Sequence, residues 1–253
     1  MILARRTAGS AVRSVPRLTT GARALDELLG GGIESDTVTE FYGGAGTGKT
    51  NVCLSTSLRA AAGGHRVVYV DTEGVSPERL EQVARGVVGG KGDVDGAVSD
   101  LLSNLLFFSP MSMAEQRNLV EKAVRLARGQ AKIGLIVLDS ATTYYRLDYM
   151  ADDTMRKNLL AQILQLLTLA REEHVAVLLT NQVYTDVETD ELEPVGGYVL
   201  RHNAKAIVRL DWVSPSVREA VLVKHRSLPE GLRARFTITA DGLGEVEEDA
   251  ANS

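Results

Sequence analysis

Apolar, β-branched stretches alternate with amphipathic stretches along most of the chain. The strand-like stretches cover residues 37–42, 66–70, 105–108, 133–138 and 175–180. The helical stretches between them cover residues 51–62, 77–88, 114–128 and 154–173. Strands of a parallel sheet show such continuous apolar runs, because crossover helices bury both faces of the sheet. The pattern therefore predicts an α/β fold with a mostly parallel central sheet flanked by helices.

The pattern changes in the last quarter of the chain. Residues 206–213, 218–223 and 233–239 are short strand-like runs without long helices between them, which predicts antiparallel strands at one edge of the sheet. Near the N-terminus, residues 18–33 predict a short helix that Thr20 caps and that a run of three glycines ends.

Length, charge and cysteine content limit the kinds of protein that this chain can be. The chain has 253 residues, which suits one large α/β domain, and its formal net charge of −5 excludes a protein coated with positive charge. No apolar segment of secretory length begins the chain, and no run of about 18 apolar residues occurs in it. The single cysteine, Cys53, excludes an internal disulfide. We therefore expect a cytoplasmic protein that does not enter a membrane.

The two ends of the chain differ in charge. An N-terminal arm, residues 1–17, contains only basic charged residues, and the C-terminal tail, residues 244–253, is acidic. We expect a core over residues 18–243 between them. The arm either holds DNA phosphates or is a solvated terminus, and the sequence leaves both interpretations open.

Residues 43–50 read GGAGTGKT and fit the pattern G-x-x-x-x-G-K-[ST] of a phosphate-binding loop. A strand-like run precedes the loop and a helical run follows it, which is the order such a loop needs. Glycines let backbone N–H groups approach phosphate oxygens, while the lysine reaches the β and γ phosphates and the threonine binds Mg²⁺. The predicted nucleotide-binding residues are Gly43, Gly44, Ala45, Gly46, Thr47, Gly48, Lys49 and Thr50.

Polar residues end three other strand-like runs. Asp139 ends the run IGLIVLD, where a carboxylate can bind Mg²⁺. Glu73 follows the run RVVYVD and is the candidate general base for water, with helix capping as the alternative. Gln182 follows the run at 175–180 and is a candidate sensor of the γ phosphate, again with capping as the alternative. No guanine-reading N-K-x-D occurs, which favours ATP over GTP.

Six segments in a fixed order give a more specific indication. They are LTTGARALDELLGGGI, FYGGAGTGKT, YVDTEG, IVLDS, TNQV and PVGGYVLRH. Together they resemble the catalytic core of RecA-type recombinases, from about residue 18 to residue 243, and most closely that of an archaeal paralogue of the RadA recombinase. The resemblance implies a RecA-like P-loop NTPase core.

The resemblance also implies roles for single residues. Lys49 and Thr50 would bind phosphate and Mg²⁺, and Asp139 would hold the metal. Glu73 would activate water and Gln182 would sense the γ phosphate. Arg79 matches an arginine that packs on adenine in RadA-like cores. The candidate DNA contacts are Arg5, Arg6, Arg146, Lys205 and Arg209.

The chain departs from RadA-like recombinases at two loops and at one strand end. The loops after Asp139 and after Gln182 are rich in acidic residues where DNA phosphates would require cations, which argues against efficient strand exchange. The segment KHRSLPEG begins with Lys224 where the ATP cap of RadA-like filaments begins with aspartate. Lys224 and Arg226 resemble the basic pair by which RecA-fold helicases and clock ATPases reach a neighbouring subunit's γ phosphate; a solvated strand end is the alternative.

The sequence thus predicts a DNA-binding ATPase with weak hydrolysis that assists or regulates homologous recombination and DNA repair beside the main recombinase. ATP and Mg²⁺ are the expected cofactors. The expected partners are DNA, preferably single-stranded, a RadA-type recombinase, a junction-cleaving nuclease and further copies of the chain. The alternative is a clock-type signalling ATPase, although that family usually duplicates the domain. A nonhydrolysing scaffold and a small-molecule kinase fit the motifs less well.

Overall fold

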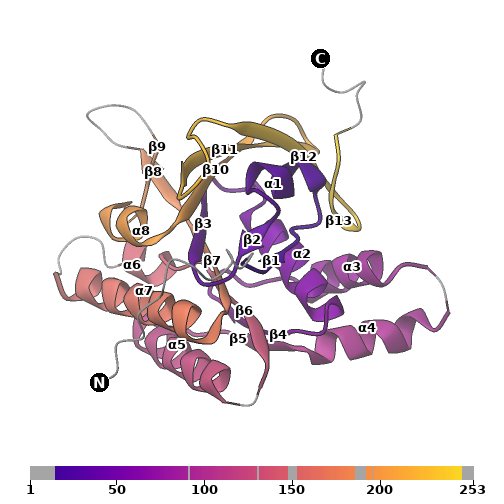
Figure 1. Cartoon of the computed structure of the whole chain (residues 1–253), viewed down its shortest axis with the longest axis horizontal. Helices are drawn as coiled ribbons and strands as arrows, with labels where there is room; N and C mark the ends of the chain where they lie inside the picture. The colour runs from indigo at the N-terminus through magenta and orange to yellow at the C-terminus, as the bar shows by residue number, and fades with distance from the viewer. Residues whose placement is uncertain are drawn as a thin grey trace, which may run out of the picture.

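The computed structural model describes residues 15–90, 92–129, 131–147, 153–185, 192–195 and 197–246. Nine strands form the central sheet in the order β13-β12-β11-β10-β3-β7-β6-β4-β5 (Figure 1). Its parallel part consists of β10 (Ala206–Trp212), β3 (Val38–Tyr42), β7 (Ala176–Asn181), β6 (Ile133–Asp139), β4 (Arg66–Asp71) and β5 (Leu105–Phe108). The predicted α/β fold with a mostly parallel sheet is therefore confirmed.

An antiparallel edge completes the sheet. It consists of β11 (Val217–His225), β12 (Arg233–Thr239) and β13 (Gly242–Gly244). The predicted antiparallel edge is confirmed, but it begins one strand later than expected, because β10 pairs parallel with β3 and only its other neighbour, β11, runs antiparallel to it. The sequence could not reveal this, since the direction of a strand depends on the path of the connection before it.

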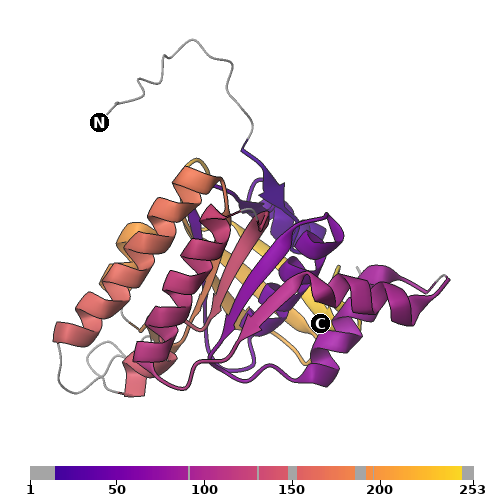
Figure 2. The ribbon, with the colours of Figure 1, turned by 90° about the horizontal axis from the view of Figure 1, so that it is seen from below.

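Helices cover both faces of the sheet (Figure 2). On one face lie α1 (Arg23–Leu28), α2 (Lys49–Ala62), α3 (Pro77–Val88) and α4 (Val94–Ser103). The other face is covered by α5 (Met113–Arg128), α7 (Asp153–Glu173) and α8 (Gly197–Asn203), with α6 (Thr143–Leu147) packed near the start of α7. Alternate residues of β3 enter the two cores: Phe41 packs with the first set of helices, and Val38 and Tyr42 pack with the second.

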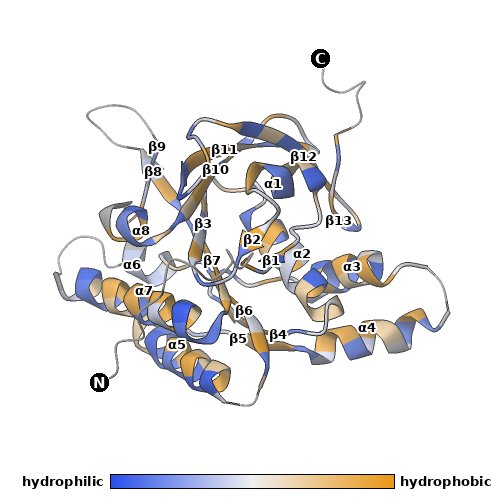
Figure 3. Ribbon diagram, in the orientation of Figure 1, coloured by the Kyte–Doolittle hydropathy of each residue, from blue (hydrophilic) through white to orange (hydrophobic). Residues whose placement is uncertain are grey.

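Hydrophobic residues concentrate on the central strands and on the sheet-facing sides of the helices (Figure 3). Two small sheets lie outside the main one, β1 (Arg17–Leu18) with β2 (Ile33–Glu34), and β8 (Val183–Thr185) with β9 (Leu192–Pro194). None of the helices in the described part of the chain is long and apolar enough to cross a membrane.

Helix α1 begins differently from the prediction. Its N-cap is Ala22, which has no side-chain cap, so Thr20 is not the capping residue. Thr20 lies two residues too early, and its N–H and hydroxyl donate to Asp26 inside the helix at 2.8 and 2.7 Å. The predicted end is confirmed, because the glycines at 31 and 32 donate their N–H groups to the Asp26 carbonyl at 2.7 and 3.1 Å.

Candidate nucleotide-binding site

The phosphate-binding loop lies between the end of β3 and the start of α2. The backbone at Gly43 and Gly48 has φ values of 155° and 96°. A Cβ at Gly43 would lie 2.3 Å from the carbonyl oxygen of Leu210, and one at Gly48 would lie 2.6 Å from Cδ1 of Ile238. Only glycine fits at these positions, and the N–H groups at the start of α2 are thereby presented to an anion.

A cavity of about 600 Å³ opens over this loop. It brings together residues from four parallel strand ends and from the antiparallel edge, as expected where the carboxyl ends of parallel strands meet. The residues that line it are Gly43, Gly44, Ala45, Gly46, Gly48, Lys49, Thr50, Asn51, Glu73, Asp139, Gln182, Val183, Arg218 and Ile238. Thr47 is buried instead, with its hydroxyl donating to the Gly44 carbonyl at 2.8 Å.

Lys49 points into its own loop. Its Nζ donates to the carbonyl oxygens of Gly43 and Gly44 at 2.8 and 2.9 Å. Burial lowers the pKa of Lys49, while the nearby carboxylates of Glu73 and Asp139 raise it. The Lys49 ammonium group thus lies near the carboxylates of Glu73 and Asp139. The phosphates of a bound nucleotide would add further negative charge beside it.

Asp139 is fully buried at the end of β6. Its carboxylate accepts hydrogen bonds from the Tyr69 hydroxyl at 2.7 Å and from the Thr180 hydroxyl at 2.5 Å. Burial raises the pKa of Asp139, and hydrogen bonds from Thr180, Tyr69 and Thr50 lower it. Thr50 and Asp139 thus form a pair of oxygen ligands of the kind that Mg²⁺ uses.

These two residues fit a magnesium ion that is shared with a nucleotide. Among the described residues, no group of three or more His, Cys, Asp or Glu side chains could hold a metal ion. Mg²⁺ in nucleotide sites is bound by one or two protein oxygens together with phosphates and water. The pair formed by Thr50 and Asp139 has this composition.

Glu73 lies on the turn after β4, and Asp71 shapes that turn. The Asp71 carboxylate accepts the N–H groups of Glu73, Gly74 and Val75 at 3.1, 2.9 and 2.7 Å. Oε1 of Glu73 in turn accepts from Nε2 of Gln182 at 2.5 Å and from the Thr143 hydroxyl at 3.0 Å. The structure thus joins two residues that the sequence placed at separate strand ends, and adds Asp71, which sequence reasoning missed as a turn-forming residue.

Arg79 does not line the cavity. Its Nε donates to Oδ1 of Asn51 at 2.8 Å, and its guanidinium also donates to the carbonyls of Thr239 and Ala240 at 2.8 and 2.9 Å. Arg79 therefore ties α3 to α2 and to the end of β12. Its packing on adenine stays a prediction.

Sequence reasoning missed Arg218. Its Nε donates to the carbonyl of Gly46 at 3.1 Å, and its Nη1 donates to the carbonyls of Ser214 and Val217 at 2.8 and 3.0 Å. Its guanidinium lies 5.9 Å from the ring centroid of Trp212, the cross-strand partner of Arg218, and this tryptophan is 56% exposed. The pairing of β10 with β11 brings Arg218 to Trp212 and to the phosphate-binding loop, and no local sequence pattern predicts that pairing.

Lys224 and Arg226 lie at the other end of the sheet. Lys224 pairs with Ile207 near the start of β10, whereas Arg218 pairs with Trp212 at the end of that strand, beside the phosphate-binding loop. Nζ of Lys224 donates to the carbonyls of Arg201 and Ala204 at 2.6 and 2.9 Å. Neither Lys224 nor Arg226 lines the cavity over the phosphate-binding loop of the same chain.

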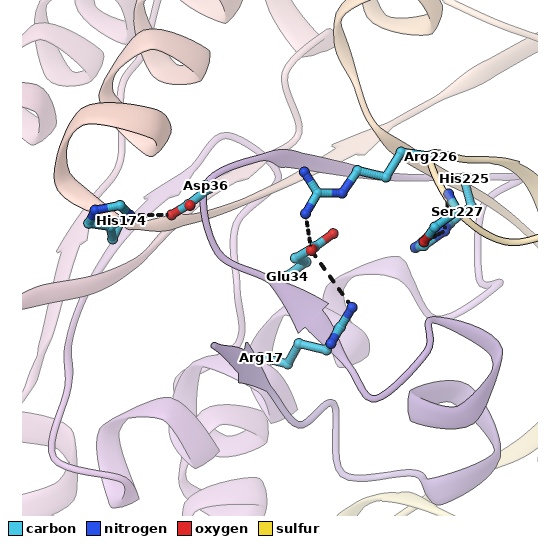
Figure 4. A network of polar contacts seen from close by, with 7 residues as sticks. All are labelled: Arg17, Glu34, Asp36, His174, His225, Arg226 and Ser227. Atoms are coloured by element: carbon cyan, nitrogen blue, oxygen red, sulfur yellow. Dashed lines mark hydrogen bonds and ion pairs between the residues drawn. The ribbon is translucent and has the colours of Figure 1, made fainter. Parts of the chain in front are cut away.

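Arg226 takes part in a network that ties the end of β11 to the N-terminal strands. The buried carboxylate of Glu34 accepts from Arg226 and forms an ion pair with Arg17 (Figure 4). In the same view, His174 contacts Asp36 through Nδ1 and Oδ1 at 2.7 Å. A role of Arg226 at another subunit would require it to leave Glu34, so that role stays a prediction.

The candidate DNA contacts are spread over the molecule. Lys205 joins α8 to β10 and donates its backbone N–H to the carbonyl of Val38 at 2.9 Å. Arg209 forms an ion pair with Asp211 at 2.9 Å. Arg5, Arg6 and the side chain of Arg146 lie outside the part of the chain that the structure describes.

Comparisons with known proteins place this architecture in a family. A model of the family described as Rad51 matches residues 12–246. The DNA repair and recombination protein RadB of Methanoculleus marisnigri is 41% identical over 231 residues, which cover 91% of this chain and 98% of that protein. The chain belongs to the Rad51 family, in its RadB group. The resemblance to RecA-type recombinases that the ordered segments indicated is thereby confirmed.

Further RadB relatives show the same extent of similarity. The RadB protein of Halobacterium salinarum is 40% identical over 237 residues, covering 92% of this chain and 96% of the relative. The RadB protein of Pyrococcus abyssi is 40% identical over 233 residues, which cover 90% of this chain and 94% of that protein. A crystal structure of the RadB recombinase superposes with a TM-score of 0.75 at 36% identity, covering 91% of this chain and all of that one.

Proposed function

We propose that this RadB-type chain is a Mg²⁺-dependent ATPase with slow turnover that binds DNA and assists homologous recombination and DNA repair beside a main RadA-type recombinase. The observation that carries the proposal is the contact of Gln182 with Glu73 at 2.5 Å inside the cavity over the phosphate-binding loop. The curated RadB relatives, which are named DNA repair and recombination proteins, support the cellular role.

The phosphate-binding loop and the polar residues that face it each have a task in this proposal. The loop N–H groups and Lys49 bind the phosphates of ATP, and Thr50 and Asp139 hold Mg²⁺, which would neutralise charge on the β and γ phosphates. Glu73 accepts a proton from the attacking water. Gln182 and Thr143, which both donate to Oε1 of Glu73, orient this carboxylate and link it to β7 and α6.

The accessory role is proposed from charge. The loops that follow Asp139 and Gln182 contain acidic residues, and carboxylates repel DNA phosphates. Arg209, a candidate DNA contact, is paired with Asp211. These features support DNA binding that is weaker than that of a strand-exchange recombinase, together with reliance on a RadA-type recombinase for the exchange itself.

Assembly into an oligomer is proposed from the placement of Lys224 and Arg226. They lie at the end of the sheet opposite to the phosphate-binding loop, so each lies far from the nucleotide of its own chain. In a head-to-tail arrangement this end of one copy would face the cavity of the next, and a cation there would stabilise charge on the γ phosphate.

The test is ATP turnover by the purified chain and by its Lys49→Ala variant, each with and without single-stranded DNA, together with DNA binding at two salt concentrations. We expect slow turnover that DNA does not stimulate, loss of turnover in Lys49→Ala, and DNA binding that weakens with salt. Strong stimulation by DNA would instead indicate a strand-exchange recombinase. Absence of DNA binding at low salt would reject the role in recombination and favour a signalling ATPase.

A further inference from the structure

A carboxylate lies inside the sheet beneath the proposed catalytic site. Glu40 is on β3, three residues before the phosphate-binding loop, and is 1% exposed. Its strand has β7 on one side and β10 on the other, so it is in the middle of the sheet. An ionised carboxylate is costly in such a place unless it has partners, and Glu40 is the only charged residue of its strand.

Asn181 is the hydrogen-bonding partner of Glu40. Its Nδ2 donates to Oε1 of Glu40 at 2.9 Å and to the carbonyl of Val195 at 2.9 Å. Its Oδ1 accepts from the Thr142 hydroxyl at 2.7 Å. The amide of Asn181 therefore has a partner for each of its polar atoms, and Glu40 is the only charged one among them.

The same groups fix the backbone on both sides of Gln182. The N–H of Gln182 donates to the Thr142 hydroxyl at 3.4 Å, and its carbonyl accepts from the N–H of Val195 at 2.9 Å. Thr142 and Val195 are the two groups that Asn181 holds in addition to Glu40. Any displacement of Asn181 would therefore move the peptide that presents the Gln182 side chain to Glu73.

A second anchor lies on the other side of Glu40. Ile207 pairs with Glu40 on β3 and with Lys224 on β11, so Glu40 and Lys224 flank the same residue of the sheet. Lys224 donates to the carbonyls of Arg201 and Ala204 at the end of α8. The segment that begins at Gln182 and ends with α8 is thus held at both ends by groups that surround Glu40.

We propose that Glu40 is a positioning residue for ATP hydrolysis, which holds Gln182 against Glu73 through Asn181 when its carboxylate is ionised. This inference rests on the proposed ATPase function. In this proposal a residue outside the cavity controls how Gln182 lies against Glu73. A displacement of reacting groups by about 1 Å can slow an enzyme by up to about a hundredfold.

The ionisation of Glu40 falls in the physiological range. Burial raises its pKa from 4.5 to about 7, against the opposing effects of the Asn181 hydrogen bond and the Lys224 charge. Below this pH the carboxyl becomes neutral, and its attraction for the Asn181 amide and for Lys224 weakens. The titratable groups that interact with Glu40 are Lys224 on β11 and Tyr42 on β3. The charged groups that act on these two neighbours in turn are Arg209 and Asp211 on β10 and Glu193 on β9, near Tyr42, and Arg201, Lys205 and Glu230, near Lys224.

The first measurement is the pH profile of ATP turnover in wild type and in Glu40→Gln between pH 6 and pH 8.5. We expect the kcat of wild type to rise with a midpoint of about 7. In Glu40→Gln we expect a flat profile with kcat at least about tenfold lower at pH 8 and KM for ATP nearly unchanged. The matched control is Glu219→Gln, the same change on β11, where Glu219 pairs with Arg233 and Arg235 outside the site; it should keep the wild-type profile.

The second measurement does not require turnover. Hydrogen–deuterium exchange of the peptides that contain Gln182 and Val195 is compared, at matched pH, between the same three proteins with a nonhydrolysable ATP analogue bound. Protection that grows through pH 7 in wild type and in Glu219→Gln, but not in Glu40→Gln, would support the proposal. Equal protection in all three proteins, or a kcat profile of Glu40→Gln that follows wild type, would overturn it. Absence of turnover in wild type with pH-dependent protection would reject only the ATPase function.

Discussion

Gln182 donates through its side-chain amide to Oε1 of Glu73 at 2.5 Å, and this contact joins the end of β7 to the turn after β4. The two residues are 109 positions apart in the sequence. The contact makes the candidate base dependent on a second strand, so the site can be tested by separating proton transfer from positioning.

Replacing Glu73 with glutamine removes the proton acceptor and keeps the shape of the side chain. We expect Glu73→Gln to bind ATP as wild type does and to lose at least about a hundredfold in kcat, the usual contribution of a general base. Gln182→Ala should lower kcat less, because Thr143 still holds Glu73. Equilibrium binding of a fluorescent ATP analogue and single-turnover kinetics measure the two effects. Equal kcat in wild type and Glu73→Gln would exclude Glu73 as the base.

Adding one methyl group to the phosphate-binding loop should destroy the site. Gly43→Ala would place a Cβ 2.3 Å from the Leu210 carbonyl oxygen, so the loop must move away from β10. We expect loss of ATP binding and a loss of about 2 kcal/mol or more in the free energy of unfolding. Gly90→Ala is the control, since no atom lies within 4 Å of its Cβ position. Urea unfolding and ATP binding of both variants make the comparison.

Glu40 also predicts how stability depends on pH. Because its pKa in the folded protein, about 7, lies above the value of 4.5 for an exposed glutamate, its favourable contribution is complete below pH 4.5 and is lost as pH rises through 7. At about 1.4 kcal/mol per pKa unit the loss is about 3 kcal/mol. Glu40→Gln lacks this titration. The free energy of unfolding in urea should therefore fall less in Glu40→Gln than in wild type as pH rises from 5 to 8. Parallel pH dependences would show that Glu40 titrates normally.

Lys224 and Arg226 predict complementation between subunits. A double variant in which both become alanine keeps its own phosphate-binding loop, while Lys49→Ala keeps the intact basic pair. If the pair acts on the neighbouring copy, a mixture of the two inactive proteins should recover part of the wild-type turnover, and wild-type turnover per molecule should rise with protein concentration. A mixture that stays inactive while wild type shows no concentration dependence would indicate that both cations serve only the fold.

The boundaries of the main strands and helices could be predicted from the sequence because each run has a clear period and ends at turn-forming residues. The run at 105–108, the helix at 77–88 and the strand at 233–239 have the predicted bounds. Helix α4 and the hairpin of β8 and β9 were not predicted. α4 follows a glycine-rich stretch and begins with Asp93 as its cap, and β8 and β9 are only three residues each.

The site was predictable as far as parallel strands determine it. Asp139 ends a parallel strand, Glu73 and Gln182 follow within two residues of such an end, and the ends meet at one edge of the sheet. Arg218 depends on the pairing of β10 with β11, and Glu40 acts through a side chain of β7, so both require long-range contacts. Glu40 is visible in the sequence as a charged residue inside the strand-like run at 37–42, but the pattern of apolar residues alone gave it no role.

The chain contains one tryptophan, Trp212. Its ring lies over the guanidinium of Arg218, which holds the Gly46 carbonyl of the phosphate-binding loop. A nucleotide that draws this loop toward its phosphates would change the environment of the indole. The protein therefore contains its own optical probe, and intrinsic fluorescence can follow ATP binding in real time without a label on either the protein or the nucleotide.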